Sequence, residues 1–100
     1  LMQITDVRVF PVEEEKLKGY ATITFDDCFV IRDLKIISGT SGLFVAMPSK
    51  KRKDGTYRDV AHPLNSEMRN AIENKVLEAY RAAAESGAKP QAADSEQGDL

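Results

Sequence analysis

The sequence predicts an α+β fold, in which an antiparallel β-sheet of about five strands is followed by one long C-terminal α-helix. Two observations lead to this prediction. Up to residue 63, short runs rich in β-branched residues are separated by Gly, Pro and Asp, as is typical of strands and turns. From Leu64 onward the apolar residues recur every three or four positions, which is the period of one helix face. A chain of 100 residues, 42% of them hydrophobic, is sufficient for a single core.

Four segments before residue 50 have the composition of strands. The first ends before Pro11, which cannot donate to a strand ladder. Lys18-Gly19 is expected to form a turn before the second segment, and Asp26-Asp27 a turn before the third. A loop rich in Gly and Ser precedes the fourth. The predicted strands are Ile4–Phe10, Tyr20–Phe25, Cys28–Ile37 and Leu43–Met47.

The segment Leu43–Met47 is an unbroken apolar run. An antiparallel strand with one solvated face alternates apolar and polar residues, whereas this one does not. We therefore expect both of its faces to be covered, by the C-terminal helix, by a partner subunit or by both. This pattern indicates a homodimer.

Asp54-Gly55 is the strongest hairpin signal in the chain, because a two-residue type I′ turn needs positive φ at both central positions. Such a turn would place Lys53 opposite Thr56, Arg52 opposite Tyr57 and Lys51 opposite Arg58. Alternation then puts one group of residues on each face of the ribbon. The two groups are Lys51, Lys53 and Arg58 on one face, and Lys50, Arg52 and Tyr57 on the other.

The C-terminal helix is expected to begin near Pro63, where Asn65 or Ser66 can cap the first turn, and to end near Glu85 or Ser86. It would contain about 20 residues and be about 30 Å long. Residues 87–100 are polar and lack an apolar period, which predicts a disordered tail after a single domain of residues 1–86. The predicted apolar stripe of the helix comprises Leu64, Met68, Ile72, Val76, Ala79, Tyr80 and Ala83.

The charges are unevenly distributed along the chain. The net charge is −2, which by itself argues against a polyanionic partner. Residues 50–58, however, contain five basic side chains and one acidic side chain, whereas both flanking parts of the chain are acidic overall. A polyanion responds to the field within about 8–10 Å, so such a basic island can bind it despite the overall charge.

The sequence offers little for catalysis or for cofactor binding. Cys28 and His62 are the only residues of their types, and no spacing typical of a metal site or of a phosphate-binding glycine loop occurs. A catalytic triad from Asp59, His62 and Ser66 lacks the usual glycine context. We therefore expect no enzyme, no catalytic residue, no cofactor, no metal and no small-molecule substrate. No apolar run is long enough for a membrane span, and no signal-peptide pattern is present, so a cytoplasmic protein is expected.

The basic island itself has two interpretations. Lysines on exposed strands discourage edge-to-edge pairing, so the island could protect a strand edge. The density of charge, the neighbouring Tyr57 and the guanidinium of Arg52 favour nucleic-acid binding instead, because aromatic rings stack on bases and arginine suits phosphate. A two-stranded ribbon can also enter a major groove. Spacing alone does not decide between the two.

Four parts of the chain together match a known family. They are Met2–Val9, Phe29–Ile37, Gly42–Ser49 and Asp54–Asn65, and their most specific stretches are G-L-F-V-A-M-P-S and D-x-A-H-P-L-N. In these parts the chain resembles the bacterial SpoVG family (stage V sporulation protein G, a septation regulator), and the similarity covers residues 2–85.

The resemblance implies a small α+β homodimer in the bacterial cytoplasm. It implies effects on septation, cell division and the cell cycle, on sporulation, and on gene expression through transcription. It also implies binding to DNA, and for some members to RNA. Transferred to this chain, it places the first binding candidates in the hairpin and second choices on the exposed side of the helix. The candidates are Lys50, Lys51, Arg52, Lys53, Tyr57 and Arg58, followed by Arg69 and Lys75.

Two functional hypotheses follow from the sequence. In the first, a dimeric regulator contacts nucleic-acid phosphates through duplicated hairpins. In the second, the hairpin docks on an acidic surface of another protein, and nucleic-acid affinity is incidental. The modest overall charge and the lack of a recognised groove-reading motif keep the second hypothesis open.

Overall fold

In a computed structural model, which describes residues 2–85, the chain forms six β-strands and one α-helix. The α+β prediction is confirmed, although the strands divide into two sheets. The expected tail, residues 87–100, lies outside the described residues. The elements are β1 (Ile4–Pro11), β2 (Leu17–Phe25), β3 (Phe29–Gly39), β4 (Gly42–Ala46), β5 (Ser49–Lys51), β6 (Tyr57–Asp59) and α1 (Ser66–Glu85).

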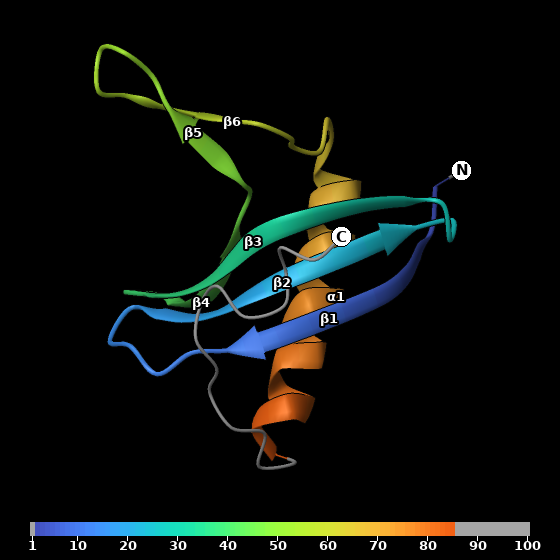
Figure 1. The fold of residues 1–100 in the computed structure, drawn as a ribbon. Coiled ribbons are helices and arrows are strands. Elements are labelled where there is room, and N and C mark those ends of the chain that lie inside the picture. The colour runs from blue at the N-terminus through green and yellow to red at the C-terminus, as the bar shows by residue number, and fades with distance from the viewer. Residues whose placement is uncertain (1, 86–100) are drawn as a thin grey trace.

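The main sheet is an antiparallel meander with the order β1-β2-β3-β4, so each strand pairs with its neighbour in the chain (Figure 1). Short turns make this order the simplest one. The strands β5 and β6 pair only with each other and form a hairpin that stands away from the main sheet (Figure 1). The outer strands of the main sheet are therefore β1 and β4.

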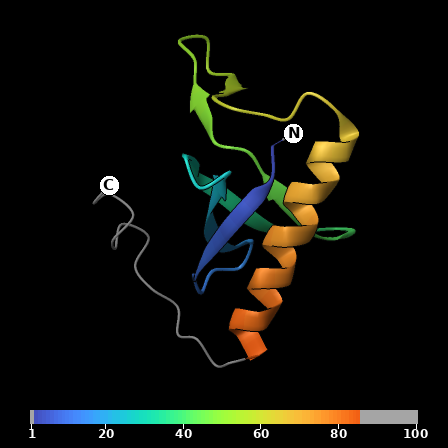
Figure 2. The same cartoon turned by 90° about the vertical axis from the view of Figure 1, so that its right-hand side faces the viewer.

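The helix α1 crosses one face of the main sheet, and the core lies between them (Figure 2). Alternate residues of the central strands point to the helix, and three helix residues meet them. Ile23, Leu34, Ile36 and Val76 are the largest side chains that are fully buried. The other core members are Ala21, Phe25, Val45, Ile72 and Leu77.

The start of the helix agrees with the prediction. The side chain of Asn65 accepts a hydrogen bond from the backbone N–H of Met68 at 2.7 Å, which is the contact expected of an N-cap residue. The predicted stripe is correct except at its first residue, because Leu64 precedes the helix and is 90% exposed. Leu77, which is absent from the predicted stripe, is buried because the helix face in contact with the sheet is wider than that stripe.

The predicted turn at Lys18-Gly19 is wrong, because β2 begins at Leu17 and passes through both residues. Gly19 is buried opposite Pro11, and a Cβ atom there would lie 3.2 Å from the carbonyl oxygen of Phe10. The glycine therefore permits close strand contact rather than a turn. Between β3 and β4 the chain turns over two residues, so the expected Gly- and Ser-rich loop is shorter than its composition indicates.

The strand β4 is covered on one face only by the described chain. Val45 is 3% exposed beneath α1, whereas Phe44 is 42% exposed on the opposite face. The helix therefore supplies the predicted cover on one face, and the described chain leaves the other face open. Cover by a second copy stays a prediction.

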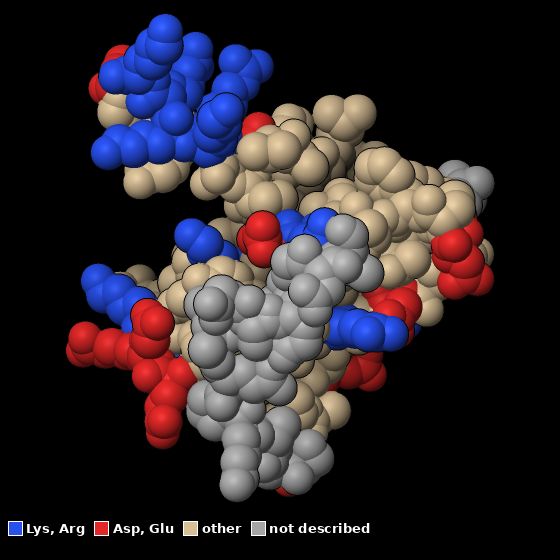
Figure 3. All heavy atoms as spheres, in the orientation of Figure 1, with Lys and Arg blue, Asp and Glu red and all other residues tan. Residues whose placement is uncertain are grey.

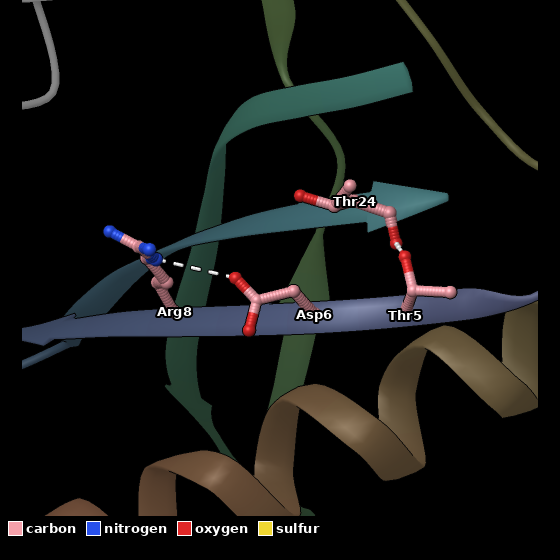
Figure 4. A network of polar contacts seen from close by, with 4 residues as sticks. All are labelled: Thr5, Asp6, Arg8 and Thr24. Carbon is pink, nitrogen blue, oxygen red and sulfur yellow. Dashed lines mark hydrogen bonds and ion pairs between the residues drawn. The ribbon is translucent and has the colours of Figure 1, made fainter. Parts of the chain in front are cut away.

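The first strand holds the β2–β3 turn in place. The hydroxyl of Thr5 accepts a hydrogen bond from the backbone N–H of Asp27 at 3.0 Å. The same hydroxyl donates to the carbonyl of Thr24 at 3.3 Å (Figure 4). On the same strand Arg8 pairs with Asp6 at 3.3 Å (Figure 4). Both partners of this ion pair are exposed, so it contributes at most about 1 kcal/mol to stability.

Candidate nucleic-acid interface

The basic residues predicted to bind lie on the β5–β6 hairpin, residues 49–59, which we call the basic arm. Every residue of the basic arm is exposed. Figure 3 shows its lysine and arginine side chains gathered at the end that projects from the body of the molecule. The hairpin therefore presents its charge without packing against the sheet.

The turn of the basic arm differs from the prediction. The N–H of Arg52 donates to the carbonyl of Thr56 at 2.6 Å, and the N–H of Gly55 donates to the carbonyl of Arg52 at 3.0 Å. Within this turn, only Gly55 has a positive φ, at 92°. These contacts define a three-residue loop, residues 53–55, with glycine in the left-handed position, instead of the predicted two-residue turn.

The longer loop moves the strand register by one residue. Lys50 lies opposite Arg58, and Lys51 lies opposite Tyr57. The predicted faces are therefore wrong, because a shift of one residue moves side chains to the other face. One face carries Lys50, Arg52 and Arg58, and the other carries Lys51 and Tyr57. The first face is positive, whereas on the second face Asp59, two positions after Tyr57, balances the charge of Lys51.

Asp54, the one acidic residue of the loop, is engaged within it. Its carboxylate accepts hydrogen bonds from the hydroxyl of Thr56 at 2.7 Å and from the backbone N–H of Thr56 at 3.0 Å. The hydroxyl bond is the largest cause that holds the pKa of Asp54 below its ordinary value, and the backbone bond adds to it. The carboxylate thus stabilises the turn.

The five cations of the basic arm line one shallow hollow of about 470 Å³, together with Asp59 and Val60. Within residues 2–85 none of the five forms an ion pair. Tyr57 is 68% exposed and lines an adjoining hollow with Arg58. The structure therefore brings together six of the eight predicted residues: Lys50, Lys51, Arg52, Lys53, Tyr57 and Arg58.

The two helix candidates are separate from this cluster. Arg69 and Lys75 are exposed on α1, but neither lines the hollow of the basic arm. They differ by six positions, which corresponds to about 600° of helix rotation, so they lie on different sides of the helix. Their role as secondary contacts stays a prediction.

A larger groove that the sequence reasoning missed lies between β3 and the base of the basic arm. It has a volume of about 780 Å³. Figure 3 shows the molecule hollowed beneath the projecting hairpin. The exposed Phe29-Val30 pair at the start of β3 was the available signal, since two adjacent apolar residues after a turn do not fit a simple alternation. Residues that line the groove include Tyr20, Phe29, Val30, Lys35, Pro48 and Val60.

A β-bulge shapes the floor of this groove. Ile31 pairs with Ile23 and Leu34 pairs with Ala21, so two residues of β3, Arg32 and Asp33, share the space opposite one residue of β2. Asp33 has a φ of 69°, which non-glycine residues rarely adopt. A bulge bends a strand and redirects its side chains. This bulge places Arg32 and Asp33 in the lining of the groove.

In the described part of the chain, other kinds of site would involve a metal ion, the single histidine or a membrane-spanning helix. Residues 2–85 contain no group of three or more His, Cys, Asp and Glu side chains that could hold a metal ion. The ring nitrogen Nδ1 of His62 lies 2.9 Å from the carbonyl oxygen of Pro63, an exposed local contact. Among the described helices, none is long and apolar enough to cross a membrane.

Comparison with known families identifies the chain. A model of the SpoVG family matches residues 2–82. The chain belongs to the SpoVG family. The resemblance found in the sequence is thus confirmed, and the match includes the basic arm, the groove and all of α1 except residues 83–85.

Several relatives of the SpoVG family align with this chain over most of the length of both proteins. A relative from Myxococcus xanthus, "Putative septation protein SpoVG", is 68% identical over 79% of this chain and 80% of its own. SpoVG proteins of the same name from Anaeromyxobacter sp. and Caldicellulosiruptor saccharolyticus are 62% and 47% identical. They cover 89% and 86% of this chain, and 92% and 99% of their own.

Proposed function

We propose that this SpoVG-family chain is a nucleic-acid-binding regulator that contacts the phosphates of DNA, and also of RNA, through its basic arm. The observation that carries the proposal is the projecting hairpin with five cations and no ion pair in the described residues. The name of its relatives supports a role in septation, which we extend to sporulation and gene expression. The proposed role is binding in the cytoplasm, without a catalytic step.

The strand order separates the lysines from the edges of the main sheet, which are β1 and β4. The lysines of the hairpin can protect only β5 and β6, both of which are edges of a two-stranded sheet. Lys50 also faces Arg58 directly. Like charges in opposite positions destabilise a hairpin, so folding alone does not favour this pair. Binding to a polyanion supplies a reason for it.

The salt dependence of binding tests the proposal. The logarithm of the association constant falls linearly with the logarithm of the salt concentration. If Lys50, Lys51 and Arg52 each neutralise one phosphate of duplex DNA, changing all three to alanine makes this slope shallower by about 2.7. Fluorescence anisotropy with duplex DNA and with RNA of the same sequence measures this slope. The matched control changes Arg8, Lys16 and Arg81 to alanine, which removes the same charge from exposed positions outside the basic arm.

An unchanged affinity and slope in the arm variant would contradict the proposal. So would equal losses in the arm and control variants, because net charge rather than the basic arm would then determine affinity. Binding weaker than about 10⁻⁴ M at physiological salt would favour the hypothesis of an acidic protein partner.

We also propose that the chain acts as a homodimer. The support is Phe44, which is 42% exposed on the edge strand β4, opposite Ile37 on the face away from α1. An exposed aromatic residue next to an apolar neighbour is typical of an interface. Light scattering at micromolar concentration should give the mass of two chains, and Phe44→Ser should lower it to that of one chain. A monomeric mass for the unchanged protein would contradict this proposal.

A further inference from the structure

The groove beneath the basic arm combines apolar and cationic side chains, and Asp33 is the one acidic residue of its lining. Phe29 is 60% exposed and Val30 42% exposed, and both line it. Lys35 lines the same groove next to its cross-strand neighbour Tyr20. Aromatic rings with lysines between them form the usual surface for unpaired bases, because the rings stack on the bases while the cations contact the phosphates.

The groove is continuous with the basic arm. Val60 is 68% exposed and lines both the groove and the hollow that the five arm cations line. A nucleic-acid strand whose phosphates contact the arm can therefore extend past Val60 and reach the groove without leaving the protein surface.

The length and the edge of β3 fit such a strand. The segment Phe29–Lys35 spans about 20 Å at the usual rise per strand residue, which is long enough for a short run of nucleotides. The strand β4 pairs with β3 only over Lys35–Gly39, and before Lys35 the edge of β3 borders the groove. Backbone groups along a strand edge can hydrogen-bond to the exposed edges of unpaired bases.

The exposed ring of Phe29 disfavours a nucleic-acid duplex as the ligand of the groove. Bases in a duplex are stacked on each other and present only their edges, so they cannot cover the ring of Phe29. The exposed ring of Phe29 beside the cations favours a nucleic acid over an acidic protein segment, because a base can stack on the ring while its phosphate contacts a cation.

Resting on the proposed nucleic-acid function, we infer that the groove between β3 and the basic arm binds a short run of unpaired nucleotides. Phe29 stacks on a base, Lys35 contacts a phosphate, and the basic arm holds the flanking backbone. The protein therefore prefers single strands, loops or locally opened duplexes to intact duplexes.

The test compares an unpaired oligonucleotide of about 12 residues, as DNA and as RNA, with the same DNA sequence annealed to its complement. The full chain should bind the single strands more tightly. Phe29→Leu should weaken single-strand binding by at least about fivefold, the lower end for loss of one stacked base, and leave duplex binding unchanged. Phe29→Tyr keeps the ring and should bind like the unchanged protein.

Two further variants complete the comparison. Lys35→Gln should lower the salt slope on the single strand by about 0.7, the value for one phosphate contact. Leu64→Ala removes an apolar side chain outside the groove that is more exposed than Phe29, at 90% against 60%, and should bind like the unchanged protein. Circular dichroism and light scattering on every variant report folding and oligomeric state.

Different failures are distinguishable. If the unchanged protein binds neither single strands nor duplex, the proposed function and this inference are both overturned. If it binds duplex as tightly as single strands, or if Phe29→Leu weakens both equally, the inference alone is overturned. A change of mass in Phe29→Leu would assign the groove to a second copy of the chain and would also overturn it.

Discussion

Lys50 lies directly opposite Arg58 on the basic arm, so two positive side chains share one face of a short hairpin. A pair of like charges in this position opposes strand pairing. The hairpin has only three residues in each strand and does not pair with the strands of the main sheet, so little else offsets the repulsion. The pair of Lys50 and Arg58 therefore disfavours folding of the hairpin but favours binding to a polyanion. A change of Lys50 should affect hairpin stability and nucleic-acid binding in opposite directions.

Lys50→Glu should stabilise the hairpin and weaken nucleic-acid binding at the same time. The change replaces a repulsive cross-strand pair by an attractive one, worth about 0.2–1 kcal/mol. The N–H of Arg52, which donates across the hairpin to Thr56, reports this stability. Its hydrogen exchange, followed by NMR, should slow by between about 1.4- and fivefold, while anisotropy shows weaker binding.

Lys51→Glu is the matched control, because it makes the same charge change on the adjacent residue opposite Tyr57. It should weaken nucleic-acid binding similarly but leave the exchange of the Arg52 amide nearly unchanged. If Lys51→Glu slowed exchange and Lys50→Glu did not, the register predicted from the sequence would be the correct one.

Gly55→Ala should open the basic arm without unfolding the protein. Gly55 has a φ of 92°, and a Cβ atom there would meet nothing within 4 Å, so the cost comes from the backbone alone. For an L-residue in the left-handed region it is about 1–2 kcal/mol. The Arg52 amide should exchange between about five- and 30-fold faster, while the melting temperature of the main sheet changes little.

Gly55→Asn is the control for this change, because asparagine tolerates the left-handed region better than alanine does. It should show a smaller increase in exchange. Equal exchange in Gly55→Ala and the unchanged protein would contradict the three-residue loop.

Glu73 links the helix to the outer strand β4, and its removal should lower stability. The Glu73 carboxylate accepts a hydrogen bond from the backbone N–H of Val45, with 3.4 Å between Oε2 and the nitrogen. Glu73→Ala leaves this partly buried N–H without its acceptor, which should lower the free energy of unfolding by about 1 kcal/mol. Urea denaturation measures the difference.

Glu73→Gln retains an acceptor oxygen and should lie within about 0.5 kcal/mol of the unchanged protein. If both variants were equally destabilised, the charge of Glu73 rather than its hydrogen bond would be the cause.

The sequence predicted those parts of the fold that local patterns determine. The helix was found because its apolar period is long, and its start was located near Pro63 because Asn65 or Ser66 could cap the first turn. The basic arm was located because charge density is a property of the chain itself. Family membership followed from specific segments shared with SpoVG.

The sequence did not predict features that depend on distant contacts. Asp54-Gly55 is compatible with loops of two or three residues, and pairing of the flanking strands selects the longer one. Gly19 resembles a turn residue but is needed for close contact with Phe10. The Phe29-Val30 pair is one signal of the groove, but its other wall was not predictable, because Phe29 and Val60 are 31 positions apart in the sequence and only the fold brings them to one surface.

The turn of the basic arm should respond to acid through Asp54. Hydrogen bonds from Thr56 lower the pKa of the Asp54 carboxyl in the folded protein. The stabilisation is therefore complete above the ordinary pKa of aspartate and is lost as the pH falls through the lowered value. Thr56→Val removes the hydroxyl, which is the larger cause, and should move the NMR titration midpoint of Asp54 to higher pH. Thr56→Ser retains a hydroxyl and should keep the midpoint low. An unchanged midpoint in Thr56→Val would mean that the hydroxyl does not stabilise the carboxylate, and acid would then leave the turn intact.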